Sequence, residues 1–468
     1  MNINRAIARV VRLFVVAYCL LLVRQFYIQV ISGPRLAHDV HNPRTALLGA
    51  YRGDIVARDG SLLAHSTPQG RVYALGPALA HAVGYASARY GTSGIEAAYD
   101  ADLAPRPLGN DPIGQIVQLV QRREPVPALR GAAVVTTIEP AVQRALYDAL
   151  QAYPRGAGVA LDPRTGEVLA LASVPSFDPA RISATFPAIA VRPDSPLLDR
   201  ALAGLYPPGS TFKIFTAAAG LAAGTVTLES TFDDPGAYAV GNFVVHDNEG
   251  EATGYQNLTG AFALSSNVDF AQIALKLGLQ GWYDAAARWN LGEKPGFTLP
   301  AERDRLPARS TVTPSILAQL AFGQADLLVT PLRMANVTAT IAARGRQFRP
   351  YLVRAVRDGG RTISSTRPQS RGNPVSAQVA SDVRTMMVAV VARGTGTAAA
   401  LPGVRVAGKT GTATNPAGRS HAWFVAFAPA DAPRVAVAIV VENAGYGGEV
   451  AAPIARRVIA VALAHSRS

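Results

Sequence analysis

The chain has 468 residues and a formal net charge of +13, with 49% hydrophobic and 16% charged residues. It is too apolar for a disordered protein and too poor in glycine and proline for a fibrous one. Its length predicts two or three domains. Positive charge is carried by 41 arginines and only four lysines, Lys213, Lys276, Lys294 and Lys409. Because lysine can lose its proton while arginine stays charged, these four positions are candidates for chemistry.

The positive charge does not by itself identify a partner. The sequence has no cluster of five or more basic residues, no zinc-finger spacing and no RNA-binding aromatic signature, which argues against nucleic acid. The single cysteine, Cys19, excludes an internal disulfide framework. His38 and His41 have no cysteine or acidic cluster beside them to complete a metal site. No metal ion or cofactor is therefore predicted.

Residues 1–31 are predicted to form a cytoplasmic tip and an uncleaved transmembrane helix. The apolar run Leu13–Val23 lies between Arg12 and Arg24. As a helix, Val10–Ile31 would span about 33 Å, enough for a bilayer if both arginines snorkel. A cleaved signal peptide is the alternative, but no good small-residue cleavage site follows closely. Basic residues before the run predict a cytoplasmic N-terminus and an extracellular remainder. Arg24 could instead contact a membrane partner, although snorkelling is the simpler interpretation.

The remaining chain is predicted to form two α+β domains. Residues 32–130 carry turn signals without a long periodic pattern, which favours a small, irregular membrane-proximal domain. Residues 131–468 have strand patterns near both ends and helical patterns between them, which favours one larger domain. The expected helices and strands of this domain are a strand at 132–138, a helix from Pro140, a hairpin at 158–174, helices at 212–223, 258–274 and 316–322, strands at 404–407, 422–427 and 435–441, and a helix at 454–464.

The first motif that carries chemistry is the segment Tyr206–Lys213. A Pro-Pro-Gly turn precedes Ser210, an apolar helical run follows it, and Lys213 lies three residues later on the same helix face. A serine hydroxyl is a weak nucleophile, and a neutral lysine could activate it if the site lowers the lysine pKa. A helix N-terminus would favour negative charge developing at the serine. Taken alone, the pattern is more often an N-cap serine followed by an exposed lysine.

The second motif is Ser265-Ser266-Asn267, which interrupts the otherwise apolar helical segment 258–274. It could be a helix break or an N-cap near Ser266. It could also be a polar cluster that lines a cleft, with Ser265 relaying a proton and Asn267 binding a substrate amide.

The third motif is Lys409-Thr410-Gly411-Thr412, which follows the strand pattern at 404–407. A strand beside a cleft can pair with an extended peptide, and Gly411 would allow a backbone to approach closely. Lys409 supplies a charge that suits a carboxylate. A basic edge strand that ends in a turn is the alternative for this motif taken alone.

Together the three motifs are far more specific, because they occur in the order of the penicillin-binding protein and serine β-lactamase signature. At this point the chain resembles the class B penicillin-binding proteins, in particular the actinobacterial PbpA group. The resemblance covers nearly the whole chain. Further matching stretches are Tyr51–Ile55, Asp162–Gly166, Ser176–Pro179, Thr330–Ala335 and His421–Phe424.

The resemblance implies a membrane-anchored serine D,D-transpeptidase that cross-links peptidoglycan stem peptides and is acylated by β-lactams. It implies a fold with an antiparallel sheet flanked by helices, and a SEDS-family glycosyltransferase as membrane partner. The implied roles are as follows: Ser210 is the nucleophile, Lys213 its base, Ser265 a proton shuttle, Asn267 the ligand of a substrate amide, Lys409 an electrostatic support, and Thr410 and Thr412 the ligands of the terminal carboxylate, with Gly411 between them. The backbone N–H groups of Ser210 and Thr412 would form the oxyanion hole.

Two other functions remain open from the sequence. A D,D-carboxypeptidase or β-lactamase could use the same three motifs. A non-catalytic scaffold or penicillin sensor that regulates a membrane glycosyltransferase is the other alternative, although such a protein has no need of both lysines.

Overall fold

The computed structural model describes residues 3–27, 51–105, 130–247, 250–415 and 418–465. Residues Ile3–Phe26 form helix α1, and its side chains from Val10 to Gln25 are exposed. The predicted transmembrane helix is not supported, because no helix among the described residues is both long enough and apolar enough to cross a membrane. His38 and His41, where the sequence argued against a metal site, lie outside the described residues.

A five-stranded antiparallel sheet forms the centre of the larger part of the chain. Its strands Val435–Val441 and Gly156–Leu161 are buried along their whole length, which is typical of a sheet covered on both faces. The hairpin expected at 158–174 and the strands expected at 422–427 and 435–441 are confirmed. In spatial order the strands are β15 (Ala407–Asn415), β16 (Gly418–Ala428), β17 (Val435–Val441), β7 (Gly156–Leu161) and β8 (Val168–Val174).

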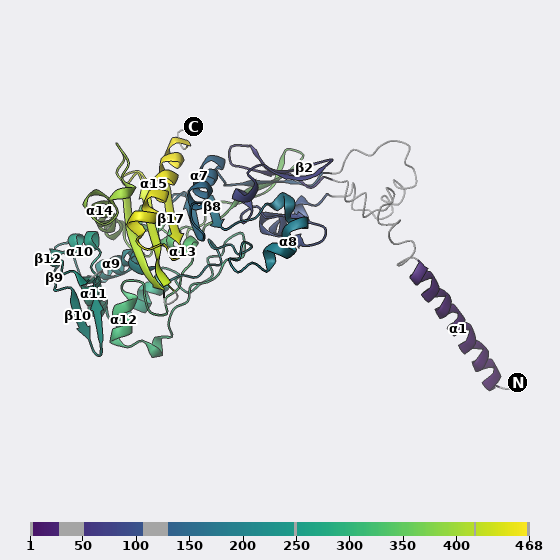
Figure 1. Ribbon diagram of the computed structural model, residues 1–468, viewed down its shortest axis with the longest axis horizontal. Coiled ribbons are helices and arrows are strands. Elements are labelled where there is room, and N and C mark those ends of the chain that lie inside the picture. Colours follow the sequence, from purple (N-terminus) through teal and green to yellow (C-terminus); the bar gives the residue numbers. More distant parts are fainter. Residues whose placement is uncertain (1–2, 28–50, 106–129, 248–249, 416–417, 466–468) are drawn as a thin grey trace.

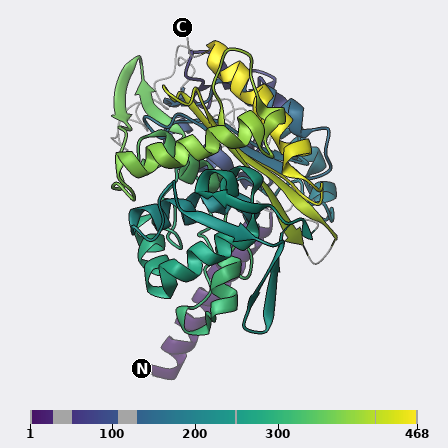
Figure 2. The same ribbon diagram turned by 90° about the vertical axis from the view of Figure 1, so that its left-hand side faces the viewer.

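Helices α7 (Pro140–Leu150) and α15 (Gly447–His465) pack on one face of this sheet and against each other. Figure 1 shows them side by side next to β17, and Figure 2 shows the domain from the side. The predicted helix from Pro140 is confirmed, with the proline at the start where its missing N–H costs nothing. The C-terminal helix is also confirmed but begins seven residues earlier than expected.

The opposite face of the sheet carries the helices that position the motifs. Helix α13 (Pro331–Ala342) lies against β17 and β7, and all of its residues are buried. The alternation along β17 divides its side chains between two cores, with Val437 and Ile439 facing α15 and Ala438 and Val440 facing the α13 side. The other helices on the α13 side are α9 (Lys213–Ala222), α10 (Leu258–Leu264), α11 (Asn267–Arg288), α12 (Pro314–Leu320) and α14 (Ala377–Arg393).

A second, six-stranded sheet joins segments that are far apart in the sequence. Its strand order is β14 (Arg361–Ser365), β13 (Val353–Asp358), β6 (Ala133–Thr136), β1 (Ile55–Val56), β2 (Leu62–Thr67) and β3 (Gly70–Tyr73). Strands β1 and β6 pair in parallel and the other neighbours are antiparallel. The sheet therefore draws strands from both sides of residue 130, where the sequence predicts a domain boundary.

Candidate active site

The segment around Ser210 is shaped by the glycine before it. Gly209 has φ +55°, and a Cβ there would lie 3.0 Å from the carbonyl oxygen of Thr412. Glycine is therefore required both for the left-handed backbone and for the close approach of β15. Residues Gly209–Phe212 form one 3₁₀ turn that leads directly into α9. This turn places Ser210, which is half-buried, at the start of a helix, as the sequence predicted.

Lys213 and Lys409 are both completely buried, and both donate to the same hydroxyl group. Nζ of Lys409 lies 2.7 Å from Oγ of Ser265, and Nζ of Lys213 lies 3.3 Å from it. Lys213 also donates to Oδ1 of Asn267 at 2.8 Å and to the carbonyl oxygen of Ser265. The Ser265 hydroxyl therefore bridges the two lysines, and residues of all three motifs are brought to one place.

The second motif is a helix break, and the break is what presents its polar groups. The helical segment expected over 258–274 divides into α10 and α11 at Ser265, so the helix break that the sequence offered as one alternative is confirmed. Ser265 has φ 70°, an uncommon conformation for a residue other than glycine and one that concentrates at functional sites. The hydroxyl of Ser266 accepts from the N–H of Asp269 at 2.9 Å and caps α11. The helix break and the N-cap near Ser266 are thus confirmed, while the proton relay by Ser265 and the amide binding by Asn267 stay predictions.

Burial changes the protonation of the two lysines in the direction that a base requires. Burial lowers the pKa of Lys213 to about 7, against the opposing effect of the nearby carboxyl groups of Asp247, Asp269 and Asp234. Burial and the neighbouring Lys213 lower the pKa of Lys409 well below its ordinary value. A neutral amine at Lys213 is accordingly accessible near neutral pH, and a general base works best in that range.

The third motif lies within an edge strand. The strand expected at 404–407 is misplaced, because β15 begins at Ala407 and includes Lys409–Thr412. Gly411 is required by space: a Cβ there would lie 2.9 Å from Cγ2 of Thr211 and 3.0 Å from the carbonyl oxygen of Pro208. This contact holds β15 against the turn that carries Ser210. Such an edge can accept an extended peptide as an additional strand.

Two further features of the site were not predicted. Oγ1 of Thr410 lies 2.6 Å from Oγ1 of Thr395, which follows α14. Three buried carboxyl groups, those of Asp234, Asp247 and Asp269, surround the second motif. No local sequence pattern predicts these contacts, because the residues that form them come from segments far apart in the chain.

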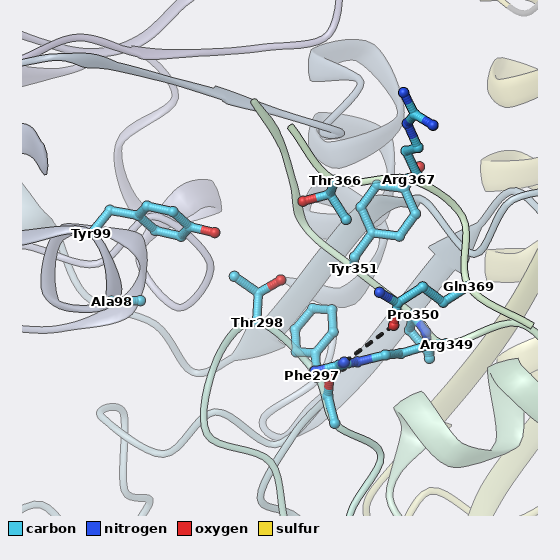
Figure 3. A pocket seen from close by; sticks show the side chains of 11 residues that line it. Ala98, Tyr99, Phe297, Thr298, Arg349, Pro350, Tyr351, Thr366, Arg367 and Gln369 are labelled. Carbon is cyan, nitrogen blue, oxygen red and sulfur yellow. Dashed lines mark hydrogen bonds between the residues drawn. The ribbon is translucent and has the colours of Figure 1, made fainter. Parts of the chain in front are cut away.

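Among the described residues, no group of three or more histidine, cysteine, aspartate or glutamate side chains is placed to hold a metal ion. A separate cavity of about 370 Å³ lies away from the three motifs, and Figure 3 shows its lining. Tyr99 of the N-terminal part and Phe297, Arg349 and Tyr351 of the larger part contribute to it. Arg349 is directed toward Gln369, to which it donates at 3.3 Å.

Comparison with known protein families gives two matches along the chain. Residues 156–460 match the penicillin binding protein transpeptidase domain, and residues 52–110 match the penicillin binding protein A dimerisation domain. The chain belongs to the penicillin-binding protein transpeptidase family. The resemblance found in the three motifs is thereby confirmed.

Individual relatives agree with this family over almost the entire chain. The peptidoglycan D,D-transpeptidase PbpA of Mycolicibacterium smegmatis is 36% identical, over 98% of this chain and 99% of the relative. The solved ceftriaxone acyl-enzyme complex of penicillin-binding protein A from M. tuberculosis has a TM-score of 0.80 at 35% identity, covering 89% of this chain and 99% of the other. The D,D-transpeptidase domain of a peptidoglycan glycosyltransferase from Eggerthella lenta gives the same TM-score, identity and coverage. The expected α+β transpeptidase fold is confirmed.

Proposed function

We propose that this chain is a serine D,D-transpeptidase that cross-links peptidoglycan stem peptides, with Ser210 as its nucleophile. The observation that carries the proposal is the Ser265 hydroxyl held between two buried lysines, one of which is one helical turn from Ser210. A buried lysine beside a serine is the arrangement that nucleophile activation needs. The names of the relatives, which are D,D-transpeptidases, support the same function.

In the acylation step, neutral Lys213 accepts the proton of the Ser210 hydroxyl while Oγ bonds to the carbonyl carbon of the penultimate D-alanine. The peptide C–N bond then breaks, and a proton passes through Lys213 and Ser265 to the departing D-alanine amine. The backbone N–H groups of Ser210 and Thr412 would stabilise the oxyanion. In the second step, an amine of a neighbouring stem peptide attacks the acyl-enzyme, which forms the cross-link and frees Ser210.

The substrate is expected to lie along β15. Its terminal carboxylate would be bound by Thr410 and Thr412 beside Lys409, while Gly411 keeps the strand close to Ser210. Asn267 would hold an amide of the stem peptide. A β-lactam would acylate Ser210 by the same route, in which the ring amide takes the place of the scissile bond.

The experiment that tests this proposal is labelling of the purified protein with a fluorescent penicillin, followed by intact-mass measurement. We expect one covalent adduct, absent in Ser210→Ala and present in the control variant Thr414→Ala, whose altered side chain is exposed on β15. An adduct that persists in Ser210→Ala would refute the assignment. An adduct lost within seconds would identify a β-lactamase, and complementation of growth by Ser210→Ala would identify a non-catalytic scaffold.

We also propose that residues 1–31 attach the chain to the cell membrane, with the N-terminus in the cytoplasm and the catalytic part outside. The arginine-flanked apolar run supports attachment, as do the exposed apolar side chains of α1, such as Leu13 at 72% and Phe14 at 71% exposure. A membrane glycosyltransferase of the SEDS family is proposed as partner on the resemblance. Fractionation of cells is the test: a chain without residues 1–31 should leave the membrane fraction, and its retention there would contradict the attachment.

The proposed division of labour assigns residues 32–130 to a non-catalytic pedestal and residues 131–468 to the transpeptidase domain. The two family matches support this division, because they fall on either side of residue 130.

A further inference from the structure

Three buried carboxyl groups lie directly behind the second motif. Asp234 ends β9 (Thr231–Asp234), Asp247 follows β11 (Phe243–His246), and Asp269 lies in the first turn of α11. Their exposed fractions are 0%, 8% and 0%. Within the part of the chain that the structure describes, none of the three forms an ion pair with an arginine or lysine within 4.0 Å. Burying a carboxyl group without such a partner costs free energy, so hydrogen bonds from the surrounding residues have to compensate for it.

Asp247 contacts every residue of the motif that follows Ser265. Its Oδ1 accepts from the backbone N–H of Asn267 and, at 3.3 Å, from that of Val268. Its Oδ2 accepts from the hydroxyl of Ser266 at 3.3 Å. The first N–H groups of a helix have no partner within the helix, and Asp247 satisfies two of them from a distant segment. Asp247 thus fixes the turn whose other side contacts Lys213.

Asp234 and Asp247 act on each other's protonation. The N–H of Gly236 donates to Asp234 at 2.8 Å, and the hydroxyl of Thr253 donates to its other oxygen. Burial acts to raise the pKa of Asp234, but its hydrogen bonds hold it below its ordinary value. Burial and the neighbouring Asp234 raise the pKa of Asp247 to about 7. The neutral form of Asp247 is therefore accessible near neutral pH.

The charge on Asp247 acts on Lys213. Among the groups that favour the ammonium form of Lys213, Asp247 is the strongest, followed by Asp269 from α11 and Asp234 from β9. Burial and the charge of Lys213 lower the pKa of Lys409 from β15. A second negative charge at Asp247 would stabilise the ammonium form and leave less of the neutral amine that the reaction needs.

We propose that Asp247 is a positioning residue of the acyl-transfer site, which fixes the turn Ser265–Val268 through its hydrogen bonds to Ser266, Asn267 and Val268. The inference rests on the proposed function, since this turn presents Ser265 and Asn267 to Lys213. It adds a residue outside the three motifs to the machinery of the reaction.

The test is the pH dependence of the acylation rate of the whole protein by a fluorescent penicillin. Asp247→Asn keeps the shape, the acceptor for the N–H of Asn267 and a donor for Asp234, but it can never become negative. We expect its plateau rate to stay within about threefold of the unchanged protein, because the geometry is kept. The plateau is reached at pH values above the pKa of Lys213, where its neutral form predominates.

Asp247→Ala should behave differently, because it removes the acceptor for the N–H groups of α11. We expect the plateau rate to fall by about tenfold or more through the chemical step rather than through penicillin affinity. Asp233→Asn is the matched control, since it makes the same charge change at an exposed neighbour of Asp234 and should leave the profile in place. Thermal unfolding of each variant shows whether the fold is kept.

An unchanged plateau in Asp247→Ala would overturn the proposal, as would a plateau in Asp247→Asn that falls as far as the one expected for Asp247→Ala, because Asp247→Asn keeps the acceptor for the N–H groups of α11. If Asp247→Ala does not fold, the Asp247→Asn plateau still decides the matter. A wrong assignment of Asp247 can be told apart from a wrong assignment of the function. Only in the second case would the Ser210→Ala variant still be labelled by penicillin.

Discussion

Nζ of Lys409 donates a 2.7 Å hydrogen bond to Oγ of Ser265, a residue 144 positions earlier in the chain. Because Lys213 donates to the same hydroxyl, two residues that would both be cations in water share one acceptor inside the protein. Burial lowers the pKa of both lysines, and the charge of Lys213 lowers the pKa of Lys409 further. The pair is therefore arranged to release and return a proton rather than to hold two charges.

The requirement for a removable proton predicts the outcome of Lys213→Arg. Arginine stays charged at every accessible pH, so it cannot accept the proton of Ser210. We expect acylation by penicillin to fall by roughly 10³-fold or more, as when a general base is lost. Lys276→Arg is the matched control, because Lys276 is exposed, lies over the ring of Phe232 and belongs to none of the three motifs. A normal rate in Lys213→Arg would exclude Lys213 as the base.

The lowered pKa of Lys213 also predicts the direction of the pH dependence. The ammonium form cannot act as a base, so the acylation rate should be low at pH values well below the pKa of Lys213. It should rise as pH passes the value of about 7 to which burial lowers that pKa. An unperturbed lysine would place this rise near a pH of about 10 instead. Stopped-flow acylation across the neutral and alkaline range distinguishes the two, and a flat profile would contradict both.

The contact between β15 and the turn of Ser210 predicts that Gly411→Ala impairs acylation. The added methyl group would lie within 3.0 Å of Thr211, Pro208 and Trp423, so β15 has to move away from the nucleophile. A displacement of this size costs about tenfold to a hundredfold in rate. Thr414→Ala, at an exposed position on the same strand, should acylate normally. Equal rates for the two variants would show that the strand tolerates the methyl group.

A stability prediction concerns the N-terminal part of the chain, around Glu96, rather than the site. Glu96 is completely buried and forms ion pairs with Arg52 at 2.9 Å and with Arg71 at 2.7 Å. Removing one partner of a buried pair leaves an uncompensated charge, so Glu96→Ala should lower the free energy of unfolding by about 3–5 kcal/mol. Asp100→Ala breaks the exposed pair of Asp100 with Arg52 and should cost below ~1 kcal/mol. Urea denaturation measures both, and similar losses would contradict the distinction.

Much of the secondary structure could be predicted because it depends on local patterns. Apolar residues at the helical period marked α7 and α15, and a turn between two apolar runs marked the hairpin of β7 and β8. The predictions were less exact where distant segments meet. The sequence offers a helix break near Ser266 but not the left-handed conformation of Ser265, whose contacts with Lys213 and Lys409 come from segments far along the chain.

The sequence by itself determined the family and the chemical inventory, because three short motifs in a fixed order are specific and two of the four lysines fall within them. Only the tertiary structure decided how these residues act on one another. Burial that lowers a lysine pKa, a hydroxyl shared by two lysines, and the carboxyl pair of Asp234 and Asp247 all arise between segments far apart in the chain. Such effects depend on the distances between charged groups and on the exclusion of water from the site, and a local sequence pattern predicts neither of them.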